Sequence, residues 1–263
     1  MSRARRLAIV LGLLGAAVIA TVMAAPIPQD PAYHHLADAR TFFGIPNALN
    51  VISNVPFVLV GALGAWAVRP GGGGTARFID GRERWPWMVF FAGLLLTGFG
   101  SAYYHLEPNN QRLVWDRLPL AGALMGLFAA VIGERIGVRA GMALLAPLIM
   151  AGLGSVLWWH GGEVRGHGDL RPYALVQFYP LVAVPLMLYL FGPRYTLGGA
   201  VLATIAVYGL AKVFELLDGP IFAMGSVVSG HTLKHLAAGA ASYVIVWMLK
   251  TRRPGPRFAR GVR

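Results

Sequence analysis

Three histidines, His105, His231 and His235, lie within apolar stretches of the sequence, where an ionisable side chain needs a partner or a function. With 3.6 residues per turn, His231 and His235 project from one face of a helix. A single histidine in an apolar helix is more often a hydrogen-bonded structural residue. However, three imidazoles with a fourth position left to water form a common catalytic zinc arrangement. The sequence therefore predicts a zinc site built from these three histidines.

Two further side chains suit the chemistry of a zinc-activated water. Ser101 precedes His105 by four residues, so the two share one helix face, and Asp116 opens the next apolar stretch. A carboxylate can act as base or orienter for the water, and a hydroxyl can donate to the water or to a developing oxyanion. The alternatives are a hydroxyl bonded to its own helix for Ser101 and a helix N-cap for Asp116. We expect Ser101 and Asp116 to be catalytic.

The remaining polar residues of the apolar stretches indicate structural roles. Lys212 and Glu215 are three residues apart, which favours a buried ion pair. Lys234 lies on a different helix face from its neighbouring histidines and is expected to reach the interface or to form a structural pair. A stripe of asparagines is typical of interhelical hydrogen bonds: Asn47, Asn50 and Asn54. Four other histidines are predicted to be surface residues of outward-facing loops: His34, His35, His160 and His167.

The composition indicates a bilayer as the solvent of this chain. Of 263 residues, 56% are hydrophobic and only 13% are charged, against about 25% charged in soluble domains. The net charge of +12 lies mainly in tails and short loops, which favours membrane topology over a nucleic-acid partner. Because the chain has no cysteine, thiolate metal ligands and thiol nucleophiles are excluded.

Stretches of about 20 apolar residues predict an all-α membrane protein, since that length of helix crosses the hydrocarbon core. The predicted spans are approximately 6–25, 45–68, 86–106, 113–134, 138–159, 173–192, 196–217 and 226–249. The first is either an extra anchor or a cleavable signal, because it follows arginines and ends in small residues. We therefore expect an N-terminal hydrophobic segment (1–28), a seven-transmembrane-helix bundle (29–250) and a basic cytoplasmic tail (251–263).

Lysine and arginine counts predict the orientation of the bundle. If the N-terminus is cytoplasmic, most of the 23 basic residues fall in cytoplasmic segments. The C-terminus is then cytoplasmic as well. The end of the second core helix and the starts of the third and seventh face the extracytoplasmic side, where the predicted site residues can converge.

In this arrangement the chain resembles the alkaline ceramidase family, within a superfamily of seven-helix membrane hydrolases that includes adiponectin-receptor-like proteins. The likeness covers approximately residues 35–250. It rests on Ser101 with His105, Trp115-Asp116-Arg117, Ala211 to Glu215, Ser229 to His235 and the Asn47 to Asn54 region. The resemblance implies zinc held by His105, His231 and His235, with Ser101 and Asp116 beside the water, and cleavage of ceramide to a sphingoid base and a fatty acid. The family's acidic calcium-binding segment is missing from residues 33–40, which argues against calcium control.

The expected partner is therefore a membrane lipid, either ceramide or another N-acyl lipid, and no nucleic acid. Paired histidines on membrane helices also ligate haem, so a haem-binding electron carrier is an alternative. Lys234 in the last helix suggests a retinal protein, although the flanking histidines fit that reading poorly. A receptor-like protein that keeps the fold and the metal without turnover is a further alternative.

Overall fold

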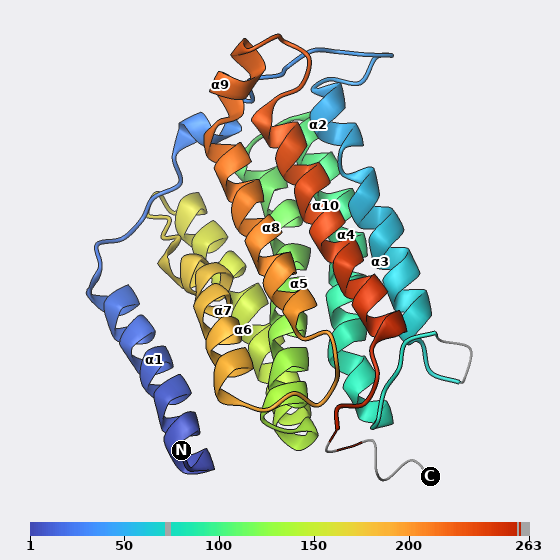
Figure 1. Ribbon diagram of the computed structural model, residues 1–263. Helices are drawn as coiled ribbons and strands as arrows, with labels where there is room; N and C mark the ends of the chain where they lie inside the picture. Colours follow the sequence, from blue (N-terminus) through green and yellow to red (C-terminus); the bar gives the residue numbers. More distant parts are fainter. Residues whose placement is uncertain (72–74, 257, 259–263) are drawn as a thin grey trace.

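The computed structural model describes residues 1–71, 75–256 and 258, which form helices and connecting segments (Figure 1). Apart from two isolated bridges, these described residues contain no β-structure. Eight spans are long and apolar enough to cross a membrane, with α2 and α3 together forming one. The helices are α1 (Arg3–Met23), α2 (Ala48–Ile52), α3 (Val55–Val68), α4 (Arg84–Leu106), α5 (Asn110–Arg135), α6 (Val138–Val164), α7 (Arg171–Leu190), α8 (Gly199–Leu216), α9 (Asp218–Ala223) and α10 (Gly230–Thr251).

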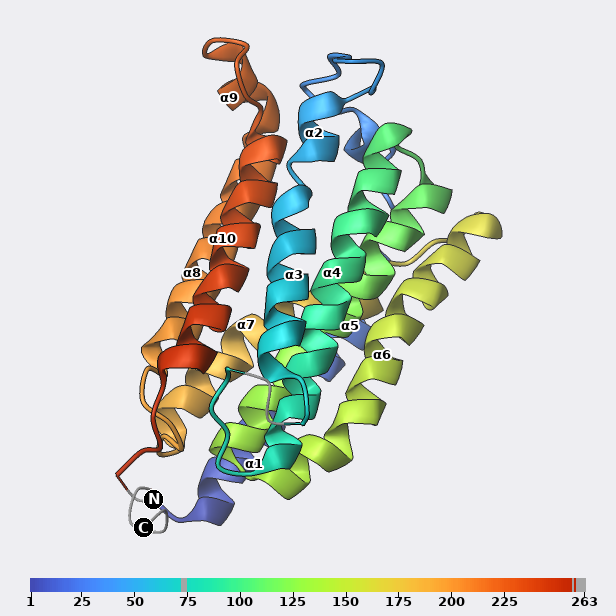
Figure 2. The same cartoon turned by 90° about the vertical axis from the view of Figure 1, so that its right-hand side faces the viewer.

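Helix α4 is the centre of the packing. It lies between α3 and α5, and α5 continues the bundle to α6 and α7 (Figure 2). On the other side, α8 packs along α10, and α10 lies against α3. Helix α1 stands at the edge of the bundle and packs on α7 (Figure 1). The chain is thus all-α with eight candidate spans, as its apolar stretches predict.

One predicted span is broken. Residues 45–68 were expected to form one helix, but α2 ends at Ile52 and α3 begins at Val55. Pro56 has no backbone N–H, and its ring would clash with the carbonyl of residue 52 in a continuous helix. The break leaves Ser53 and Asn54 between the two helices, where their side chains are buried.

Three helix boundaries differ from the prediction in ways that matter for the site. Helix α5 begins at Asn110 with Asn109 as its N-cap, so the prediction that this helix starts near residue 113 is wrong. Helix α6 extends to Val164 and therefore contains His160, which was expected in a loop. The last helix begins at Gly230 rather than at residue 226, because the Ser229 hydroxyl caps it by accepting a hydrogen bond from the Thr232 N–H.

The elements that carry the candidate site meet at one end of the bundle. Helices α2 and α9, the C-terminal end of α4 and the N-terminal end of α10 gather there, and the segment between α1 and α2 crosses the same end (Figure 1). The start of α1 and the last turn of α10 lie at the opposite end (Figure 1).

At that opposite end, Arg252 follows α10 and is fully buried, and its guanidinium donates to Glu134 of α5 at 2.5 Å. The first residues of the predicted basic tail, 251–263, are therefore packed against the bundle. Its residues 257 and 259–263 lie outside the described part of the structure.

Candidate metal centre

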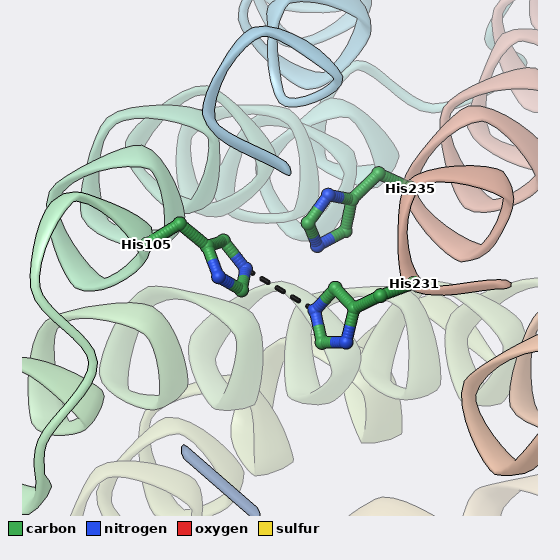
Figure 3. Close-up of side chains that lie close together, drawn as sticks. All are labelled: His105, His231 and His235. Atoms are coloured by element: carbon green, nitrogen blue, oxygen red, sulfur yellow. Dashed lines mark hydrogen bonds between the residues drawn. The ribbon is translucent and has the colours of Figure 1, made fainter. Parts of the chain in front are cut away.

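The three histidines predicted from the sequence come together in the structure. His105 from the last turn of α4 meets His231 and His235 from the first two turns of α10 (Figure 3). The three ring centroids are 4.7, 4.9 and 4.9 Å apart, so the rings form a nearly equilateral triangle. All three side chains are buried, and one ligand atom from each lies within 4.8 Å of the others.

The spacing of the ring nitrogens fits a tetrahedral ion. The Nε2 atoms of His105 and His231 are 3.2 Å apart. Two nitrogens that bind one zinc ion at about 2.0 to 2.1 Å with tetrahedral angles are separated by about 3.3 Å. Three neutral imidazoles are also a donor set that zinc accepts with a fourth position free for water or substrate. The residues present therefore fit a zinc ion.

Neighbouring groups hold the histidines in place. The hydroxyl of Ser53, in the α2–α3 break, is 2.8 Å from Nδ1 of His235. The carboxylate of Asp218, at the start of α9, accepts the backbone N–H of His231 at 2.7 Å. The side-chain amide of Asn47 donates to the backbone carbonyl of His105 at 2.8 Å. The Ser53 contact is of the kind that fixes the orientation of a metal-binding ring. The other two contacts hold the backbone of the ligand residues.

Ser53 and Asp218 were missed in the sequence analysis. The signal for Ser53 was its place between Asn50 and Asn54, three residues before Pro56, where a helix break turns polar groups inward. Asp218 had no signal of its own, because its role depends on the short helix α9 folding back over α10.

The asparagine stripe mostly makes the interhelical contacts predicted for it. Asn50 accepts a hydrogen bond from the Thr232 hydroxyl of α10, and it donates to the backbone carbonyl of Asp38. Asn47 reaches α4, as described above. Asn54 is different, because its amide donates to carbonyls within its own segment. The stripe therefore ties α2 to both helices that carry the histidines.

Ser101 and Asp116 meet where α4 and α5 come closest. A Cβ atom added to Gly100 would overlap the backbone carbonyl of Trp115, so the two backbones touch directly beside these residues. The Ser101 hydroxyl lies beside the Asp116 carboxylate, and both line the central cavity with His235. The alternative of Asp116 as a helix cap is wrong, because it lies in the second turn of α5.

A cavity of about 380 Å³ extends from this polar end into the bundle. Its apolar arm is lined by α4, α5, α7, α8 and α10, including Phe90, Leu94 and Leu127. Ser101 and Phe90, both on its wall, are separated by about 16 Å along α4 at 1.5 Å per residue. That length is about half of a 30 Å hydrocarbon core, which is the depth of one leaflet.

The cavity wall is weakest between α7 and α8. These helices are consecutive in the chain, yet α8 packs along α10 while α7 packs along α1, α5 and α6. Across the gap, the side-chain amide of Gln177 donates to the Tyr208 hydroxyl at 2.7 Å. Phe178 lines the cavity and is 48% exposed on the outside of the bundle. Few contacts between α7 and α8 therefore close the cavity on this side.

The predicted ion pair exists and is larger than expected. Glu215 accepts from Lys212 and from Lys234, each at 2.8 Å, and also from the Tyr33 hydroxyl at 3.1 Å. The structural pair expected for Lys234 is thus confirmed. All four side chains line the polar end of the cavity.

Two of the four histidines expected on the surface are more buried than predicted. His34 is half-buried and bonds the Tyr104 hydroxyl at 3.0 Å and the Asn110 side chain at 2.9 Å. His160 is half-buried within α6. His35 and His167 are exposed, as predicted. None of these four belongs to the histidine cluster.

The segment between α1 and α2 holds its own ion pair near the site. Both carboxylate oxygens of the buried Asp38 are engaged by Arg40, at 2.7 and 2.8 Å. These hydrogen bonds lower the pKa of Asp38 below its ordinary value. Arg40 also donates to the carbonyls of Ser226 and Val227, so the segment is fastened to the loop before α10.

Comparison with known proteins gives no further assignment. No protein-family model matches the chain, and a search of curated proteins finds no match. The geometry of the cavity and of the histidine cluster therefore carries the functional argument.

Proposed function

We propose that the protein is a zinc-dependent intramembrane hydrolase that cleaves the amide bond of ceramide or a related N-acyl lipid. The observation that carries the proposal is the nearly equilateral cluster of His105, His231 and His235, of which His235 lines the polar end of a leaflet-deep apolar cavity. In this proposal, the seven spans that follow α1 form the membrane bundle, and α1 is an additional hydrophobic segment. The basic-residue distribution supports a cytoplasmic C-terminus and a site on the extracytoplasmic side.

When bound, a zinc ion would polarise a carbonyl and lower the pKa of a water towards about 7. Asp116 takes the proton from the attacking water as the water oxygen bonds to the amide carbon. Ser101 donates to the carbonyl oxygen as negative charge develops there. Asp116 then returns the proton to the amide nitrogen as the C–N bond breaks. One water is consumed, and the products are a fatty acid and an amine.

The shape of the cavity supports a lipid amide over a soluble one. The apolar arm is long enough to take the acyl chain across one leaflet, while the carbonyl stays beside the histidines. The weakly packed side between α7 and α8 gives such a chain access without leaving the bilayer. Burial of apolar lipid surface supplies the binding energy.

The proposal includes no calcium ion. In the segment before α2, both oxygens of Asp38 are bonded to Arg40, which supplies the positive charge locally. A haem is disfavoured as well, because ring centroids 4.7 to 4.9 Å apart with nitrogens at 3.2 Å leave no space for a porphyrin between them.

The proposal is tested by measuring hydrolysis of a long-chain ceramide by the purified full-length protein and by Asp116→Asn. We expect the variant to lose at least a hundredfold in rate, because a positioned base contributes about 10² to 10⁴. The matched control is Glu107→Gln, which changes an exposed carboxylate outside the cavity. Equal turnover by Asp116→Asn and the wild type would overturn the mechanism. A wild-type protein that binds zinc but hydrolyses no lipid amide would favour the receptor-like alternative.

A further inference from the structure

Arg117 is a buried cation without an acidic partner among the residues that the structure describes. It follows Asp116 on α5, lines the cavity and is 6% exposed. Its Nη2 atom donates to the Gln29 side chain at 2.7 Å. Its Nη1 atom is buried and has no hydrogen-bond partner among the described residues, and no described carboxylate lies within 4 Å of the guanidinium.

Aromatic rings surround this guanidinium. Its Cζ atom is 4.4 Å from the Trp159 ring centroid, 5.1 Å from that of Tyr173 and 5.5 Å from that of Tyr33. Cation–π contacts of this kind are weaker than a charge-assisted hydrogen bond to a carboxylate. A buried guanidinium with one neutral acceptor therefore retains a strong preference for an anion.

The surrounding charges add to this preference. Lys212 and Lys234 share the single carboxylate of Glu215. Within the described part of the chain, Asp116 is the only other carboxylate that lines the cavity. Three cations thus face two carboxylates at the polar end, before any metal is counted. Tyr33 connects the groups, since its ring lies against Arg117 and its hydroxyl donates to Glu215.

From these observations we propose that Arg117 and Lys212 form a subsite for an anionic group on the amine half of the substrate. The inference rests on the proposed function and narrows its substrate class to N-acyl amino acids, amides whose amine part carries a carboxylate. With the carbonyl at the histidines and the acyl chain in the apolar arm, the amine half faces the wall that holds Arg117 and Lys212. A guanidinium binds a carboxylate through two parallel hydrogen bonds.

The covering groups allow a carboxylate to reach Arg117. Gln29 and Tyr33 come from the connection between α1 and α2, outside the spanning helices. Rotation of the Gln29 side chain frees Nη2, and Nη1 is already without a partner. A carboxylate in the place of the Gln29 amide oxygen would then satisfy both nitrogens.

The test compares a long-chain N-acylglycine with its methyl ester, which has the same acyl chain and no charge, and with a ceramide. The purified full-length protein is expected to show a higher kcat/KM for N-acylglycine than for the ester. In Arg117→Met the ratio of kcat/KM for N-acylglycine to that for its methyl ester, both measured as fatty-acid release from the amide, should fall about tenfold to a hundredfold. Arg117→Lys should restore part of the preference, because it keeps the charge without the bidentate geometry. If Arg117→Met does not fold, Lys212→Met is expected to reduce the preference in the same direction.

Arg112→Met is the matched control, since Arg112 lies on the same helix but outside the cavity. Hydrolysis of the ester and ceramide with no preference for N-acylglycine would overturn this inference and leave the proposed function standing. A preference that survives in both Arg117→Met and Lys212→Met would overturn it as well. Hydrolysis of none of the three substrates would overturn both proposals.

Discussion

Ser53 shows how a single hydroxyl can position a metal ligand. Its oxygen is 2.8 Å from Nδ1 of His235, which leaves Nε2 to face the other two histidines. Hydrogen bonding to the outer nitrogen fixes the tautomer and the ring orientation of a metal-binding histidine. The prediction from sequence included the three histidines, because apolar surroundings make them conspicuous. It did not include Ser53, because one more serine in an apolar stretch is unremarkable.

We predict that Ser53→Ala lowers zinc affinity by about tenfold to a hundredfold while the fold is retained. A competition titration with a zinc-binding dye measures this change. Ser242→Ala is the matched control, because Ser242 also lines the cavity but donates only to the Ala238 carbonyl of its own helix. If Ser53→Ala and Ser242→Ala bind zinc equally well, Ser53 does not hold His235.

At the scale of helices, hydropathy predicts which stretches become spans but not how each one begins, breaks or pairs. The break between α2 and α3 could have been predicted from Pro56, since proline lacks the N–H that continues the helical hydrogen bonds. The start of α5 was missed because its first turn, from Asn110, is polar. As a result, Asp116 was expected at a helix end but lies one turn deeper, facing Ser101.

The close approach of α4 and α5 places Ser101 beside Asp116, and it depends on Gly100. We predict that Gly100→Ala lowers the free energy of unfolding by about 1 to 3 kcal/mol, because the new methyl group meets the Trp115 carbonyl. Gly154→Ala on α6 is the control, since a Cβ there has no neighbour within 4 Å. Melting temperatures of the two variants in the same detergent measure the difference. An equal melting temperature for both would contradict direct contact of the two backbones.

The segment between α1 and α2 should loosen in acid. Hydrogen bonds from Arg40 lower the pKa of Asp38, so the pair contributes its full stability above the ordinary aspartate pKa, near 3.9. That contribution is lost as the pH falls from about 4 through the lowered pKa of the folded state. Hydrogen exchange of residues 34–46, corrected for intrinsic rates, should accelerate over this range. Asp38→Asn should be loose already at neutral pH, and wild-type exchange that stays constant across the range would contradict the prediction.

For the whole molecule, the sequence predicts the number and approximate position of the spans, because about 20 apolar residues are needed to cross a bilayer. It also predicts that His105 meets His231 and His235. His105 is at the C-terminal end of α4 and the other two are at the N-terminal end of α10, so helices that cross the membrane in opposite directions place all three at the same end. It does not predict that α8 leaves α7 to pack along α10. That choice depends on the fit of side chains between helices, and it leaves few contacts between α7 and α8 along the cavity wall.

If the three imidazoles bind one ion together, the zinc content of the protein depends on each of them. The most direct measurement is the zinc content of purified, metal-replete protein and of His105→Ala, His231→Ala and His235→Ala, with His34→Ala as the control outside the cluster. The wild type and the control should bind one zinc per chain, and each of the other variants should lose most of it. No zinc in the wild type, or one zinc per chain in all four variants, would show that the three histidines do not hold an ion together.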